Sequence, residues 1–268
     1  EIGINRLSLG VQSFNDKHLK ALGRIHDAAQ SHHAIELAQE AGFENYNLDL
    51  MFGLPGQSIN EALGDLDKAV SHTPTHISWY QLTIEPNTVF NSKPPTLPND
   101  DDIWSMQEQG QSFLETKEFK QYEISAYTKD KHPALHNLNY WQFGDYLGIG
   151  AGAHGKITNV AERKIERYTR HKIPKRYIDL AGTDAVITET RVLKQNELAL
   201  EFVMNALRLI DGVPTHLFSD RTGLPLKTAE RELLLAEDRG LIEWQLNELK
   251  PSSKGLRYLN ELLEIFVK

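Results

Sequence analysis

The 268-residue sequence contains no cysteine. Without cysteine a protein cannot form a disulfide, present a thiolate nucleophile, or hold zinc or an iron–sulfur cluster through sulfur. These chemistries are therefore excluded for the residues of this chain. The absence of cysteine says little about the cellular compartment.

Long apolar runs are also absent. No stretch approaches the roughly 18 residues that a membrane-spanning helix needs, so we expect no integral membrane segment. The opening residues, EIGINRLSLGV, carry neither a cationic segment nor a small-residue cleavage site, and so do not predict a signal peptide. Because Glu1 leads at once into an apolar, strand-like run, we interpret the chain as a piece cut within a folded domain. A cytoplasmic location is favoured.

Positive charge is scarce over most of the chain. Lysine and arginine number 29 against 37 acidic residues, and a net charge of −8 argues against nucleic acid as the main partner. The exception is the segment from Lys156 to Arg176, which holds eight Lys or Arg residues against Glu162 and Glu166. This basic segment is interpreted either as a solvated face or as a rim that recognises anions.

The first part of the chain alternates strands with helices. Three strands are predicted at Ile4–Gln12, Tyr46–Phe52 and His76–Ile84. Helices are predicted at residues 15–22, 27–41, 58–72 and 101–117, the third beginning with an S-x-x-E capping box. This order predicts an α/β fold with a parallel sheet. Three strands are too few to close a barrel. A half-barrel of three strands would leave the edge strand of its sheet exposed.

The remainder divides into two parts. Residues 121–190 are rich in aromatic residues and glycine and predict strands and functional loops. Residues 191–268 predict helix, helix, two short strands and helix, which is a winged-helix-like arrangement. From Asn196 onward nine Lys or Arg residues face twelve Asp or Glu residues, so DNA binding by this part is disfavoured.

Polar side chains cluster at the carboxyl ends of the predicted strands, where parallel α/β folds place their ligands. The candidates are Gln12 and Ser13, Arg24, Asp49, and Gln81 with Thr83 and Glu85. An amide, a guanidinium and a carboxylate together suit a ligand that bears a carboxylate, an amine and hydroxyls. Each alone also has an ordinary structural reading, such as a helix cap or a surface cation.

Five ordered motifs carry a resemblance to a known family: GVQSFND, LGRIHD, NLDLMFGLPGQS, WYQLTIEPNT and HNLNYW. In this order and spacing they resemble the HemN/HemW radical SAM (S-adenosylmethionine) proteins, and look closest to the HemW branch of haem (heme) chaperones. The resemblance covers essentially the whole chain. It implies the carboxy-terminal half of a partial (β/α)6 barrel in residues 1–120, a β-rich extension in 121–190, and a small α+β, winged-helix-like domain in 191–268.

The resemblance also implies roles for single residues. Gln12, Arg24 and Asp49 match family residues near SAM, and Gln81 is the best placement for a fourth contact. The family's CxxxCxxC motif precedes the segment that this chain resembles, so a [4Fe-4S] cluster is expected only in the full-length protein. The chain by itself is expected not to cleave SAM.

The HNLNYW motif separates the two branches of the family. The resemblance suggests His136 as a ligand to heme iron, with Asn137, Tyr140 and Trp141 beside it and His154 as a second candidate. The alternative is a histidine that hydrogen-bonds beside core aromatic residues. The basic segment could meet the heme propionates.

The function implied is that of a heme chaperone, which binds heme and delivers it to heme-acceptor proteins. The alternative is an oxygen-independent coproporphyrinogen III oxidase of porphyrin biosynthesis, so whether the protein is an enzyme stays open. A third reading, a structural or regulatory remnant without cofactors, is favoured only by the missing cysteines. A homodimer is left open.

Overall fold

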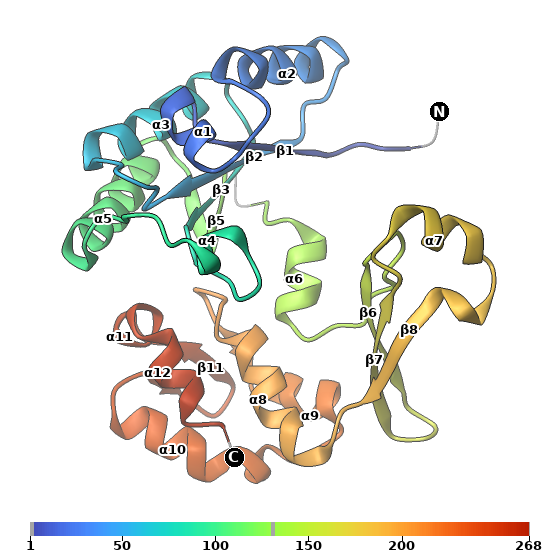
Figure 1. Ribbon diagram of the computed structural model, residues 1–268. Coiled ribbons are helices and arrows are strands. Elements are labelled where there is room, and N and C mark those ends of the chain that lie inside the picture. Colours follow the sequence, from blue (N-terminus) through green and yellow to red (C-terminus); the bar gives the residue numbers. More distant parts are fainter. Residues whose placement is uncertain (1–2, 130–131, 268) are drawn as a thin grey trace. The chain divides into compact units, whose positions relative to one another are not determined.

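A computed structural model describes residues 3–129 and 132–267. The chain separates into two compact units, Glu1–Pro133 and Ala134–Lys268 (Figure 1). Each unit has its own hydrophobic core.

The first unit is built on a five-stranded sheet with the strand order β1-β2-β3-β5-β4. Its strands are β1 (Leu7–Gln12), β2 (Tyr46–Phe52), β3 (His76–Gln81), β4 (Lys120–Glu123) and β5 (Ala126–Thr128). Strands β1, β2 and β3 are parallel, as predicted, whereas β5 pairs antiparallel with β3. The bounds of β2 are those predicted, while β1 begins later and β3 ends earlier than expected.

Helices cover one face of this sheet (Figure 1). They are α1 (Asp16–Ala21), α2 (Ala28–Glu40), α3 (Ile59–Ser71) and α5 (Asp100–Thr116), with the short α4 (Val89–Ser92) between β3 and α5. Local sequence sets their starts: Asp27 with Gln30 and Ser58 with Glu61 form reciprocal capping boxes at α2 and α3.

The face of the sheet toward the helices is apolar. Leu48, Leu50 and Ile77 are fully buried there, and Trp79 packs so closely on Gly110 of α5 that a Cβ at Gly110 would lie 1.9 Å from the indole. The alternating residues of the same strands point to the opposite face and are mostly polar, Met51 being apolar, because successive side chains of a strand alternate.

Strands β4 and β5 belong to this first unit. The backbone of Ala126–Thr128 pairs with His76–Ser78, so residues 121–133 group with the segment before them. The predicted division at residue 120 therefore falls inside the sheet, because a short antiparallel strand carries no sequence signal for the partner that it joins.

The second unit begins with α6 and a three-stranded antiparallel sheet of order β6-β7-β8. Its elements are α6 (Leu135–Trp141), β6 (His154–Asn159), β7 (Lys164–Arg170), α7 (Pro174–Leu180), a 3-10 turn (Asp184–Val186) and β8 (Ile187–Val192). The expectation of strands and loops was wrong for HNLNYW, which is helical. Leu138 and Trp141, spaced by three residues, pack against the core of this unit, and that contact stabilises a helix.

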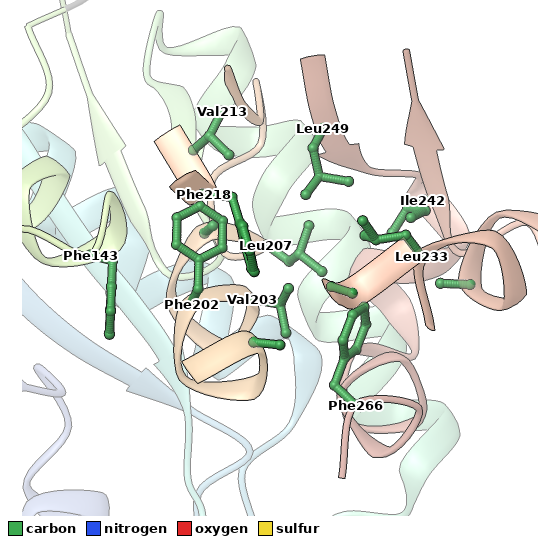
Figure 2. Packing of buried hydrophobic residues seen from close by; sticks show 14 of the residues in the cluster. Phe143, Phe202, Val203, Leu207, Val213, Phe218, Leu233, Ile242, Leu249 and Phe266 are labelled. Atoms are coloured by element: carbon green, nitrogen blue, oxygen red, sulfur yellow. The ribbon is translucent and has the colours of Figure 1, made fainter. Parts of the chain in front are cut away.

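The end of the chain forms a helical module around the sheet β10-β11-β9. Its elements are α8 (Gln195–Ala206), β9 (Val213–Pro214), α9 (His216–Thr222), a 3-10 turn (Leu226–Ala229), α10 (Glu230–Asp238), β10 (Ile242–Trp244), β11 (Glu248–Pro251), α11 (Ser253–Arg257) and α12 (Leu259–Glu264). The two long helices, the two short strands and the closing helical segment occur in the predicted order, but the structure adds the short strand β9 and the helix α9 after α8, and splits the last helix at Tyr258. Figure 2 shows its core, in which Phe202, Phe218 and Phe266 are almost completely buried.

Across the two described ranges, none of the helices has the length and apolar character that crossing a membrane would require.

Candidate functional site

The polar face of the first sheet carries a connected hydrogen-bond network. The Asn47 amide donates to Asp49 Oδ1 at 2.7 Å and to Ser8 Oγ at 2.8 Å. Ser8 Oγ in turn donates to Asp49 Oδ2 at 3.1 Å, and Ser78 Oγ donates to Asn47 Oδ1 at 3.1 Å. The strand register places all four residues on one face. The network holds both oxygens of the half-buried Asp49 carboxylate, and Ser8 beside it is exposed.

Gln12 lies at the end of β1 in the left-handed backbone region, with a φ of 67°. The Tyr80 hydroxyl donates to Gln12 Oε1 at 2.7 Å. Gln12 is 5% exposed, and among the described residues its Nε2 has no hydrogen-bond partner.

Tyr80 connects three of the predicted residues. Burial raises the pKa of the Tyr80 phenol, the charge of Asp49 raises it further, and the charge of Arg24 opposes both. Arg24 is exposed, and its guanidinium has no ion pair within the described part of the chain. The Tyr80 hydroxyl therefore contacts Gln12 directly, and the charges of Asp49 and Arg24 both act on this phenol.

Gln81 is not brought together with these three residues. Alternation along β3 places Ser78 and Tyr80 on the polar face and Gln81 on the opposite face, where it lies beside Gly53 and Ile103. Tyr80 is the residue that sequence reasoning missed. Strict alternation in HISWYQ, anchored on the apolar Ile77 and Trp79, was the signal that could have found it.

The heme candidates from HNLNYW lie on α6. His136 is exposed, and its ring meets the Tyr140 ring edge-on at a centroid distance of 6.2 Å. Tyr140 in turn packs edge-on against Tyr146 at 4.7 Å. The Arg208 guanidinium lies 4.4 Å from the centre of the Trp141 ring, and Asn137 is half-buried. The exposed His136 imidazole is thus the first ring of an aromatic row that includes Tyr140 and Tyr146.

A pocket of about 230 Å³ opens behind these rings. Its walls include Tyr140, Trp141, Phe143, Tyr146, Lys156 and Arg167. A volume of this size holds a small group, not a whole porphyrin.

Two cations of the basic segment are neutralised internally. Lys156 is 1% exposed, and its Nζ donates to the Phe143 carbonyl at 3.0 Å and to Asp145 Oδ1 at 2.8 Å. Burial lowers the pKa of Lys156 although the Asp145 carboxylate acts against it. Arg167 donates to Glu201 at 2.6 Å. The surface-facing charge of the basic segment is therefore carried mainly by exposed residues such as Lys172, Lys175 and Arg176.

His154 opens β6 and does not line the pocket. Its Nδ1 lies 3.2 Å from Thr169 Oγ1 and its side chain is exposed. Glycines on both sides of His154 pack the backbone tightly. A Cβ at Gly148 would lie 2.1 Å from the His154 carbonyl oxygen, and a Cβ at Gly155 would lie 2.1 Å from the Tyr168 ring. These two glycines are required by internal packing, whether or not a ligand approaches.

The residues present do not fit a [4Fe-4S] cluster, because the sequence has no cysteine. Within residues 3–129 and 132–267, no group of three or more metal-ligating side chains is found. The chemistry of the Gln12 amide, the Arg24 guanidinium and the Asp49 carboxylate suits the amino-acid and ribose groups of SAM.

Comparisons with known proteins agree with the two-unit fold. Residues 1–69 match the radical SAM superfamily, and residues 193–258 match the HemN C-terminal domain. The solved structure of coproporphyrinogen III oxidase (HemN) from Escherichia coli, a radical SAM enzyme, aligns with a TM-score of 0.75 and 19% identity. The alignment covers 98% of this chain and 64% of that chain, which is less than two thirds of the enzyme. This likeness establishes a mixed α/β fold of the HemN type.

Sequence relatives are more similar. The heme chaperone HemW of Haemophilus influenzae is 45% identical over 265 residues, which is 99% of this chain and 68% of that protein. The heme chaperone HemW of Escherichia coli is 44% identical over 270 residues, covering 99% of this chain and 69% of that protein. That of Bacillus subtilis is 35% identical over 274 residues, covering 100% and 70%. The chain therefore belongs to the HemW family of the radical SAM superfamily.

Proposed function

We propose that this chain is the heme-holding part of a heme chaperone, which binds heme and passes it to acceptor proteins. The observation that carries the proposal is the exposed His136 on α6, edge-on to Tyr140, with the aromatic row continuing to Tyr146. Histidine is a common axial ligand of heme iron, and flat aromatic side chains suit a porphyrin face. The names of the relatives, which are 35–45% identical over nearly the whole chain, point the same way.

The exposed cations of the basic segment would face the heme propionates. Lys172, Lys175 and Arg176 are exposed on and before α7, and a carboxylate pairs well with such donors. Heme here is cargo, so weak and reversible coordination by a surface histidine suits delivery better than an enclosed site would.

We further propose that the polar face of the first unit holds SAM through Gln12, Arg24 and Asp49. When bound next to a reduced cluster, SAM supplies radical chemistry, and the cluster ligands would come from a segment that this chain does not include. The residues of this chain would bind and orient: Arg24 the carboxylate, Asp49 a hydroxyl or ammonium, and Gln12 Nε2 an acceptor. A cytoplasmic site of action belongs to this proposal, because such clusters need a reducing compartment.

The test is a titration of the chain and its variants with heme, in which binding is monitored by the change in heme absorbance. His136→Ala is expected to weaken heme binding by about tenfold, because the axial ligand is lost. His216→Ala is the matched control, since His216 is an exposed histidine of the same unit, with its side chain 71% exposed, outside the aromatic row.

An unchanged titration for His136→Ala would contradict this assignment, and a loss confined to His154→Ala would move the ligand to β6. The rival reading, a coproporphyrinogen III oxidase, has the shared fold in its favour. Anaerobic formation of protoporphyrinogen by the protein expressed from the longest reading frame containing this chain would establish it.

A further inference from the structure

The backbone at Gln12 needs external support. Its φ of 67° lies in a region that non-glycine residues rarely adopt, and the pairing of β1 with β2 shifts register between Leu9 and Gln12. A residue in this conformation persists only where its surroundings hold it. The contacts of the next two residues, Ser13 and Phe14, show which side chain holds the backbone at Gln12 in this conformation.

Asp65 of α3 holds both of those residues. Its Oδ2 accepts a hydrogen bond from Ser13 Oγ at 2.6 Å, and its Oδ1 accepts one from the Phe14 backbone N–H at 2.8 Å. Ser13 Oγ also accepts from the Asn15 N–H at 3.1 Å, and Lys68 Nζ donates to the Phe14 carbonyl at 3.0 Å. The turn after β1 is therefore fixed from α3 at consecutive backbone positions.

A carboxylate at position 65 is energetically unfavourable, because this position of α3 is buried. Asp65 is 2% exposed and lies between Ala62, Leu66 and Ala69, which pack into the core. Burial raises the pKa of its carboxyl, against the hydrogen bonds from Ser13 and Phe14 and the charge of Lys68. An apolar side chain would serve the helix better, so the reason for a carboxylate lies in the turn that it binds.

We propose that Asp65 is a positioning residue for Gln12: by clamping Ser13 and Phe14 it sets the turn that directs the Gln12 carboxamide toward Tyr80 and toward a ligand on the polar face. Asp65 itself lies on the helix side of the sheet and touches no ligand. The inference rests on the proposed contact between Gln12 and SAM.

The experiment measures SAM affinity by equilibrium dialysis, using the protein from the longest reading frame that contains this chain. Asp65→Asn keeps the shape but gives Ser13 and Phe14 only one acceptor oxygen for two donors. It is expected to weaken SAM binding about fivefold. Asp67→Asn, an exposed aspartate on the same helix, is the control and should leave the affinity unchanged.

A double-mutant cycle separates positioning from a general structural effect. If Asp65 acts through Gln12, Asp65→Asn should cost no further affinity in a Gln12→Ala background. Equal losses in both backgrounds, or no loss in the parent, would overturn the proposal. If Gln12→Ala alone left SAM affinity unchanged, the proposed SAM contact would fail instead, and the two failures are thus distinguishable.

Ser13→Ala is a second variant that tests the same proposal if the Asp65→Asn protein does not fold. It removes the bond from Ser13 to Asp65 and the bond that Ser13 Oγ accepts from the Asn15 N–H, and it keeps the bond from Phe14 to Asp65. A smaller loss of SAM affinity, again absent in the Gln12→Ala background, is expected. Additive losses for Ser13→Ala and Gln12→Ala would overturn the clamp.

Discussion

Gln12 folds its side chain back over Gly10, two residues earlier in β1. A Cβ at Gly10 would lie 2.9 Å from Gln12 Nε2, so the glycine provides the space that the carboxamide occupies. The same carboxamide is held at its oxygen by Tyr80. The position of the Gln12 carboxamide thus depends on a glycine, on a phenol and, in the proposal above, on the turn that follows.

Gly10→Ala is predicted to displace the Gln12 carboxamide and weaken SAM binding several-fold. Its effect on the free energy of unfolding should stay within about 1 kcal/mol, because only the end of a flexible side chain must move. Equilibrium dialysis of SAM and urea denaturation measure the two quantities. Gly64→Ala is the control, since a Cβ there meets open space. Unchanged SAM affinity for Gly10→Ala would contradict the prediction, because it would show that the Gln12 carboxamide does not need the space left by Gly10.

At the scale of elements, α2 and α3 are joined by a histidine pair. His32 Nδ1 lies 2.6 Å from His72 Nε2, and the ring of Phe14 stacks on His72 at a centroid distance of 6.0 Å. One of the two nitrogens must donate and the other accept, so the contact requires that at least one ring stay neutral. Burial lowers the pKa of His72 below its ordinary 6.5, and the charge of His32 lowers it further.

This pair predicts a loss of stability in mild acid. The unfolded chain takes up a proton on His72 as the pH falls through about 6.5, while the folded chain binds it only at lower pH. The free energy of unfolding should therefore fall as the pH is lowered from about 7.5 to about 5.5. Urea denaturation at the two pH values measures it. His72→Asn should show a smaller pH dependence than the parent chain, and an identical slope in both would exclude the pair as its source.

At the scale of the whole molecule, the two units have separate cores. The large cluster of the second unit includes Phe143, Phe202 and Phe266 (Figure 2). That of the first unit includes Leu48 and Trp79. Neither cluster contains a residue from the other unit. Each unit thus buries its own apolar surface, which is the main driving force of folding.

We therefore predict that residues 134–268, expressed alone, unfold cooperatively and bind heme as tightly as the whole chain. Residues 1–133 alone should not bind it. Circular dichroism in urea and a heme titration test the two claims. A non-cooperative transition, or heme binding that requires both halves, would contradict them.

Local sequence patterns were sufficient to predict the parallel strands with their helices, the capping box at Ser58, the absence of cysteine ligands for a cluster, and the family. These follow from local periodicity, capping and motif order, which act over a few residues. Tertiary structure decided that HNLNYW is helical, that β4 and β5 join the first sheet, and that Tyr80 and not Gln81 faces Asp49. It alone also revealed the clamp of Asp65 on the Gln12 turn, because hydrogen bonds between residues 51 or 52 positions apart leave no periodic trace in a sequence.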